Sequence, residues 1–137
     1  MLSNHVTNLE LSQQLAKLGV KQETIFWWGT ESEQEPRICT DLNHYDDENS
    51  NIICSAFLSS ELGEMLPPAI VMDKYENPLH LACFSSGESY SVQLLDVDKY
   101  ERVKWFDAKT EADCRAKMLI YLIENSHLSV DEVNSNL

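Results

Sequence analysis

Short connections between strand-like segments place the tightest constraint on how this chain folds. Residues 69–72, 79–84 and 90–97 have the apolar and β-branched content of strands. Only Lys74–Pro78 and Ser85–Glu88 separate the later segments from one another. A parallel strand pair needs a crossover of about a dozen residues or more, so these connections are too short for one. The sequence therefore predicts an antiparallel meander.

Helices are predicted near both ends of the chain. Thr7 followed three residues later by Glu10 is a helix-start signal, and leucines at helical spacing continue it, which predicts a helix over 8–18. Near the other end, apolar residues recur at intervals of three and four, which predicts a helix over 111–124. Its apolar stripe should lie on the sheet, with Leu119 inward.

The remaining segments complete an α+β architecture. Residues 24–28 and 51–57 are strand-like, and 103–106 add an edge strand. Ser59 is the expected cap of a short helix over 60–66, which two prolines end. We therefore expect a mostly antiparallel sheet on which an N-terminal helix, a short central helix and a C-terminal amphipathic helix pack.

The length of the chain is typical of one domain. It has 137 residues, of which 43% are hydrophobic and 24% charged, and these values are those of an ordinary globular protein. No internal repeat, low-complexity segment or linker divides it. We expect a single domain over 1–137, with residues 1–6 and 126–137 as tails.

The cysteines and the lack of targeting signals indicate a reducing compartment. The four cysteines are far apart in the sequence and form no Cys-x-x-Cys pair: Cys39, Cys54, Cys83 and Cys114. No stretch approaches the roughly 18 apolar residues that span a bilayer, and the first residues do not resemble a signal peptide. We expect reduced, mostly buried thiols, a cytoplasmic protein and no membrane association.

Charge narrows the class of partner. Ten Lys and Arg against 23 Asp and Glu give a formal charge of −13, which repels nucleic-acid backbones and anionic membranes. The local basic cluster of Lys99, Arg102 and Lys104, with Tyr100 and Trp105 interleaved, is a weak single-strand nucleic-acid signature. Charged residues that guard an edge strand explain this cluster better. A basic protein surface remains the favoured partner.

Two segments resemble a known family. Residues 53–67, which contain Ser-Glu-Leu-Gly-Glu-Met-Leu-Pro, and 110–125, which contain Thr-Glu-Ala-Asp-Cys-Arg-Ala-Lys, are similar to two recurring motifs of small uncharacterised proteins encoded in bacterial genomes and phages. The order of the surrounding segments is similar as well. The resemblance implies a small single-domain protein of bacterial or phage origin. It implies no activity and no catalytic residues.

No metal or cofactor site is predicted. Acidic and amide residues between Asp41 and Asn49 alternate as in a calcium loop, but Asp46 and Ile52 occupy the positions where an EF-hand needs Gly and a bidentate Glu. The four histidines are scattered without the short ligand spacing of a structural zinc site. With only four glycines, the chain also lacks a phosphate-binding glycine loop.

Catalytic motifs are likewise missing, so no catalytic residue is assigned. A thiol such as Cys54 or Cys83 needs a histidine to activate it, and His80 is available. Alternation along 79–84 places Cys83 in the core and His80 on the opposite face. A small enzyme whose Cys/His site is assembled by the fold therefore stays the alternative, and a deep pocket lined by His80 and a thiol would favour it.

The leading expectation is a non-enzymatic binding or regulatory protein that acts on a basic protein partner. Adjacent Trp27 and Trp28 in one strand must face opposite ways, so one indole is expected outside the main core. Either a loop or helix covers this indole, or it is exposed as an anchor for a partner. The acidic segment begins beside the two tryptophans. The predicted interaction surface is Trp27, Trp28, Glu31, Glu33, Glu35, Asp46, Asp47 and Glu48. A homodimer built on an exposed strand edge is compatible with either function.

Overall fold

A computed structural model describes residues 2–31, 35–40 and 50–136 of the chain. The helices are η1 (Leu2–Asn4), α1 (Leu9–Lys17), α2 (Ser59–Met65), α3 (Glu111–Glu124) and α4 (Val130–Ser135). The strands are β1 (Phe26–Glu31), β2 (Arg37–Cys39), β3 (Ser50–Ala56), β4 (Ala69–Ile70), β5 (Leu79–Ser85), β6 (Tyr90–Asp96) and β7 (Glu101–Ala108). The α+β class predicted from the sequence is confirmed.

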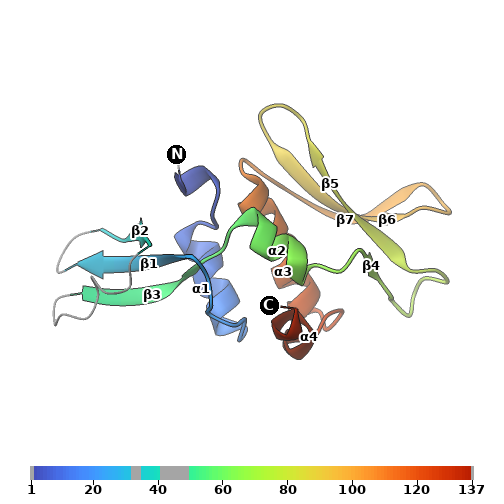
Figure 1. Cartoon of the computed structure of the whole chain (residues 1–137). Helices are drawn as coiled ribbons and strands as arrows, with labels where there is room; N and C mark the ends of the chain where they lie inside the picture. Colours follow the sequence, from blue (N-terminus) through green and yellow to red (C-terminus); the bar gives the residue numbers. More distant parts are fainter. Residues whose placement is uncertain (1, 32–34, 41–49, 137) are drawn as a thin grey trace.

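The strands form two antiparallel sheets with the helices between them (Figure 1). One sheet has the order β4-β5-β6-β7, which confirms the predicted meander and places β7 at its edge. The other has the order β2-β1-β3. We expected the helices to pack on one sheet. The chain passes from β3 into α2, two prolines end α2, and the strands that follow pair with one another in the second sheet.

Helix α3 is the centre of the hydrophobic core. It packs against β6 and β7 of the four-stranded sheet and against α1 and α2. Seven of its residues are buried: Ala112, Cys114, Ala116, Met118, Leu119, Ile120 and Leu122. The helix is therefore buried on more than the single stripe that the sequence predicted. Its start and end agree with the prediction, and Thr110 caps it by accepting from the N–H of Asp113 at 3.2 Å.

The capping residues of the first two helices differ from the prediction. Asn8, and not Thr7, caps α1, because its Oδ1 accepts from the N–H of Leu11 at 2.9 Å. Ser59 is the first residue of α2 and does not cap it. The cap position is Leu58, whose N–H donates to Oε1 of Glu61 at 2.8 Å. Only the carboxylate half of a capping box is formed there.

The strand prediction over 24–28 is wrong at both ends. Strand β1 begins at Phe26 and continues through Gly29 to residue 31. Gly29 does not end the strand because it lies at a register shift between β1 and β3, where a glycine is well accommodated. The strand predicted over 69–72 is also shorter, since β4 ends at Ile70 and pairs only with the start of β5.

Both segments that were predicted as tails contact the body of the protein. Val6 is 1% exposed and forms an isolated bridge with Leu58. At the other end, residues 130–135 form α4, and Leu128 and Val133 belong to the main core. The sequence predicted tails because these segments are mostly polar, but their few apolar residues, Val6, Leu128 and Val133, are buried.

We predict that replacing Leu119 by Ala lowers the free energy of unfolding by about 2–5 kcal/mol. Leu119 is fully buried at the centre of the core, so the substitution removes apolar contacts and leaves a cavity. Chemical denaturation of both proteins measures the difference. Unchanged stability would show that this face of α3 does not pack as described.

Candidate functional site

The three-stranded sheet lies outside the main hydrophobic core. In the described part of the chain, no member of the main hydrophobic cluster comes from β1, β2 or β3, although Cys54 and Ala56 on β3 are buried. The sheet nevertheless carries large apolar residues, since Trp27, Trp28 and Ile38 are half-buried and Ile52 is 41% exposed. Ile25, just before β1, is 61% exposed. The body of the protein therefore buries the apolar surface of this sheet only in part.

The two tryptophans have different environments. The indole N–H of Trp28 donates to the main-chain oxygen of Thr7 at 3.0 Å, so this ring points to the body of the protein. Trp28 shares its face of the sheet with Ile38 and Cys54, its partners on β2 and β3. Trp27 lies on the opposite face. Both rings are half-buried, so neither belongs to the main core.

Thr7 attaches this sheet to the rest of the protein. It is fully buried, and its hydroxyl accepts from the N–H of Phe57 at 3.0 Å and lies 2.6 Å from the hydroxyl of Ser12. Its own N–H donates to the oxygen of Phe57 at 2.9 Å. With the bond from Trp28, these contacts join α1, β1 and the end of β3. We call Thr7, Ser12, Trp28 and Phe57 the Thr7 junction.

The predicted acidic part of the interaction surface lies mostly outside the described residues. This applies to Glu33, Asp46, Asp47 and Glu48, whereas Glu31 contributes its main chain to β1. Glu35 is described and exposed. Residues 31–48 hold seven of the 23 acidic residues, with Arg37 as the single Lys or Arg among them. These acidic residues are joined by the chain to the ends of β1, β2 and β3.

A second apolar surface, which the sequence analysis missed, lies on the four-stranded sheet. The helices pack on one face of this sheet, where Val92 and Leu94 are fully buried. By the strand register, the other face carries His80, Ala82, Phe84, Ser91, Gln93, Leu95, Arg102, Trp105 and Asp107. We call these residues the uncovered face. Phe84 is 48% exposed and Trp105 43% exposed, and the guanidinium of Arg102 lies 4.3 Å from the Trp105 ring centroid.

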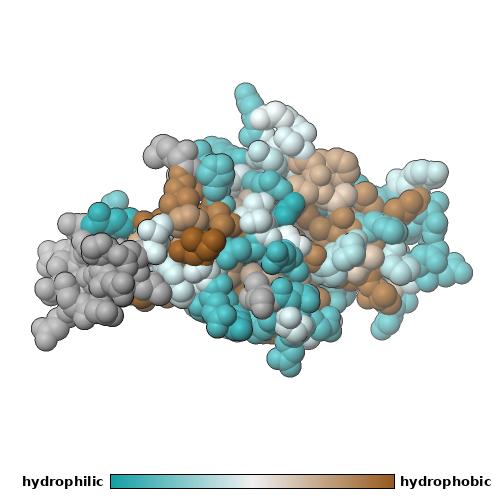
Figure 2. All heavy atoms as spheres, viewed as in Figure 1, coloured by the Kyte–Doolittle hydropathy of each residue, from teal (hydrophilic) through white to brown (hydrophobic). Residues whose placement is uncertain are grey.

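These two apolar surfaces lie at opposite ends of the molecule. In Figure 2, hydrophobic residues are visible toward both the three-stranded and the four-stranded end, and hydrophilic residues lie between them. The alternation of residues 79–85 contained a signal for the second surface, because Phe84 follows His80 at even spacing and shares its face.

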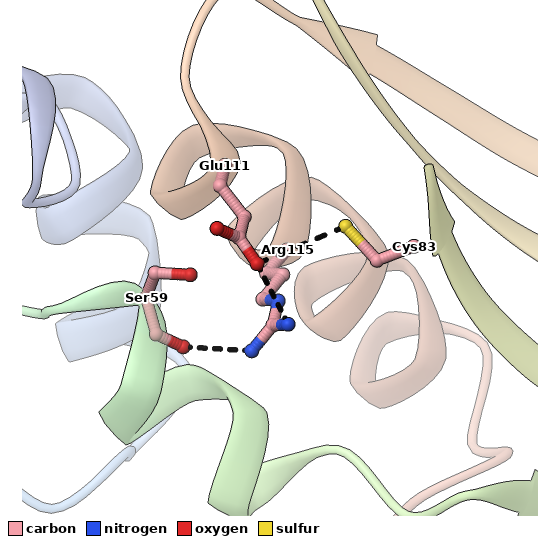
Figure 3. A network of polar contacts seen from close by, with 4 residues as sticks. All are labelled: Ser59, Cys83, Glu111 and Arg115. Carbon is pink, nitrogen blue, oxygen red and sulfur yellow. Dashed lines mark hydrogen bonds and ion pairs between the residues drawn. The ribbon is translucent and has the colours of Figure 1, made fainter. Parts of the chain in front are cut away.

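Polar contacts of Arg115 connect α2 and α3 (Figure 3). Its Nη1 donates to the main-chain oxygen of Ser59 at 3.0 Å, and its Nη2 pairs with Oε1 of Glu111 at 2.8 Å. A Cβ atom at Gly63 would overlap the guanidinium of Arg115, so a larger residue at that position would displace this group from its contacts. Gly63 and Arg115 belong to the two segments with the family resemblance. Their contact gives those segments a structural role in joining two helices.

The prediction that Cys83 is a core residue is wrong. It lies on the helix-facing side of β5, as the alternation predicted, but its thiol is exposed because the helices do not cover this end of the strand. Its Sγ is 4.0 Å from Oε1 of Glu111 (Figure 3). Cys54 and Cys114 are buried and Cys39 is half-buried, and all four cysteines are free.

Two cavities within the described residues do not bring a thiol and a histidine together. A cavity of about 330 Å³ is lined by Cys83 and Arg115 with mainly apolar residues, and no histidine lines it. Another, of about 630 Å³, lies at the end of α3 and contains His127, which contacts the Tyr121 ring, but no cysteine. His80 lies on the opposite face of β5 from Cys83. The criterion that would favour a Cys/His enzyme is therefore not met by these cavities.

Neither a metal centre nor a membrane-crossing helix is found within residues 2–31, 35–40 and 50–136. No group of three or more His, Cys, Asp or Glu in these ranges is arranged to hold a metal ion. No helix there is both long and apolar enough to cross a bilayer. The calcium-like alternation between Asp41 and Asn49 falls outside these ranges.

Comparisons with known proteins give no relative from which function can be inferred. No family model, no curated protein and no solved structure matches the chain. The resemblance to small bacterial and phage-encoded proteins therefore stays a prediction. The evidence on function is therefore the two apolar surfaces and the cavities of the protein itself.

We predict that the four thiols differ in reactivity in the folded protein. Burial raises the pKa of Cys54 and of Cys114 to about 11, so roughly one molecule in a thousand carries the thiolate at pH 8. Cys83 is exposed and should react first with a thiol reagent, whereas Cys54 and Cys114 should react only after unfolding.

Mass spectrometry of peptides from the labelled protein measures this order. Labelling under denaturing, non-reducing conditions is the control, and all four cysteines should then react. Native labelling of Cys114 as fast as that of Cys83 would contradict the described core.

Proposed function

We propose that this chain is a non-enzymatic binding protein that engages a basic protein partner through its three-stranded sheet. The site consists of Trp27 as the apolar anchor, the neighbouring exposed aliphatic residues and the acidic residues of 31–48. The observation that carries the proposal is that this sheet has large, partly exposed apolar residues that do not belong to the main hydrophobic cluster of the described residues.

The large apolar side chains of the three-stranded sheet are not explained by packing in the main hydrophobic cluster. Buried Cys54 and Ala56 attach one end of β3 near α1, and the core requires nothing more of this sheet. Tryptophan is enriched where binding energy is concentrated at protein interfaces. Because Trp28 is occupied by its bond to Thr7, Trp27 on the other face is the proposed anchor.

The acidic residues of 31–48 indicate that the partner has a basic surface. The seven acidic residues of 31–48 are joined to this sheet and have one basic neighbour in the sequence. Such a concentration of one sign attracts a basic surface, accelerates encounter and repels nucleic acid. A partner with basic residues around an apolar centre would match both the anchor and the acidic residues.

A cytoplasmic setting and a phage or mobile-element origin belong to the same proposal. Four free cysteines are consistent with a reducing compartment. The resemblance of residues 53–67 and 110–125 to phage-encoded proteins supports the second part. A small acidic protein of that origin would act by occupying a basic surface of a host protein.

The test uses a synthetic amphipathic peptide of lysine and leucine and measures its affinity by isothermal titration calorimetry. The wild-type chain should bind it, and raising salt through the physiological value of about 0.15 M should weaken binding. Trp27→Ala should lower the affinity about tenfold or more, a loss of at least about 1.4 kcal/mol, with little change in thermal stability.

Two controls separate anchoring from general charge attraction. An all-lysine peptide of the same length should bind wild type and Trp27→Ala equally, because it has no apolar residues. Val71→Ala removes an apolar side chain that is 76% exposed outside the three-stranded sheet, and it should leave affinity unchanged. Equal binding of the lysine–leucine peptide by wild type and Trp27→Ala would rule out the anchor.

A further inference from the structure

We infer that the uncovered face of the four-stranded sheet binds the same face of a second copy of this chain. This interaction is independent of the proposed basic partner, because it uses the opposite end of the molecule. The inference rests on three observations: the exposed aromatic residues, the charges on this face, and the way in which the edge of β7 is occupied.

The aromatic residues of this face are distributed so as to suit a face-to-face contact. Phe84 on β5 is opposite Ser91 of β6, and Trp105 on β7 is opposite Gln93 of β6, so the two rings lie diagonally across three strands. Both rings are close to half exposed. An antiparallel sheet that needs only one buried face normally carries polar residues on the other. Two large aromatic rings with Ala82 and Leu95 on that face instead indicate an interaction surface.

The charges favour a second copy over other occupants. The uncovered face has one basic residue, Arg102, and one acidic residue, Asp107, so it is formally neutral in a chain of charge −13. Residues 69–110 hold five Lys and Arg against seven Asp and Glu, whereas 31–48 hold one against seven. Contact through this face therefore keeps the three-stranded sheets of the two copies, to which the acidic segment is joined by the chain, at the far ends of the dimer (Figure 1).

Arg102 and Asp107 also make the face complementary to itself. They flank Trp105 on β7, toward opposite ends of the strand. A twofold axis that lies between the two sheets and crosses the strands near Trp105 places Arg102 of each copy opposite Asp107 of the other. Such isologous contacts are the commonest form of homodimer.

The edge of β7 is less suited to dimerisation than this face. The ammonium of Lys117 donates to the main-chain oxygen of Asp107 at 3.0 Å, so part of the strand's main chain already has an additional partner. Charged Arg102 and Lys104 also lie on this edge strand, and such residues discourage the pairing of edges. A face-to-face dimer is therefore distinct from the edge-to-edge dimer that the sequence suggested.

Sedimentation velocity of the full chain over a range of concentrations tests the inference. Wild type should form a dimer in a concentration-dependent manner, and added salt should tighten it by screening the repulsion between two acidic chains. Phe84→Glu and Trp105→Glu should each raise the dissociation constant about tenfold or more. Ile25→Glu, at a residue 61% exposed near the other sheet, is the matched control and should have no effect.

Charge reversal then tests the orientation. Arg102→Asp should weaken the dimer, because it places two acidic residues opposite each other, and the double variant Arg102→Asp with Asp107→Arg should restore it. A wild-type chain that stays monomeric at every concentration overturns the inference. Loss of the dimer in Trp105→Glu but not in Phe84→Glu would indicate pairing through the edge of β7 and would overturn the face-to-face contact. Failure of the double variant to restore the dimer would overturn the twofold arrangement. None of these results depends on binding of the lysine–leucine peptide.

Discussion

The Thr7 junction is the contact on which the arrangement of the two halves depends. A single buried threonine satisfies the N–H of Phe57 with its hydroxyl and the indole of Trp28 with its main-chain oxygen. Buried polar groups without partners cost about 1–3 kcal/mol each, so this network fixes one relative position of α1, β1 and the end of β3. The hydrophobic core fixes the other half, around α3.

This division explains how one small chain presents two different surfaces. The main hydrophobic cluster around α3 has contributions from the four-stranded sheet and from every α-helix, whereas the buried residues Cys54 and Ala56 of β3 lie outside that cluster. The three-stranded sheet is therefore free to carry apolar side chains for another purpose, and the acidic segment is joined to it. The four-stranded sheet has its own uncovered face, which is close to neutral. The two surfaces thus differ in the class of partner that they suit.

The sequence predicted those elements whose local pattern agrees with their tertiary surroundings. Helix α3 has matching start, periodicity and end signals, and the short turns of the meander permit only antiparallel pairing. The sequence wrongly predicted that Thr7 starts the first helix, because its hydroxyl accepts a buried hydrogen bond from Phe57 and Asn8 caps the helix instead. The alternation of apolar residues along 79–84 predicted the correct face of β5 for Cys83. It cannot show how far the helices extend along β5, and therefore did not predict that the thiol is exposed. That Phe84 and Trp105 share one face of the four-stranded sheet follows from the strand register, which no local pattern contains.

Hydrogen exchange measured residue by residue in wild type and in Thr7→Val tests the central claim, that the junction rather than the core holds the three-stranded sheet. Valine keeps the shape of the side chain and the main-chain contacts but leaves the N–H of Phe57 without its hydroxyl acceptor. The account predicts that amides of β1 and β3 lose more protection than those of α3 and β6, because the sheet opens without unfolding the core. An equal loss of protection in all four elements would contradict it.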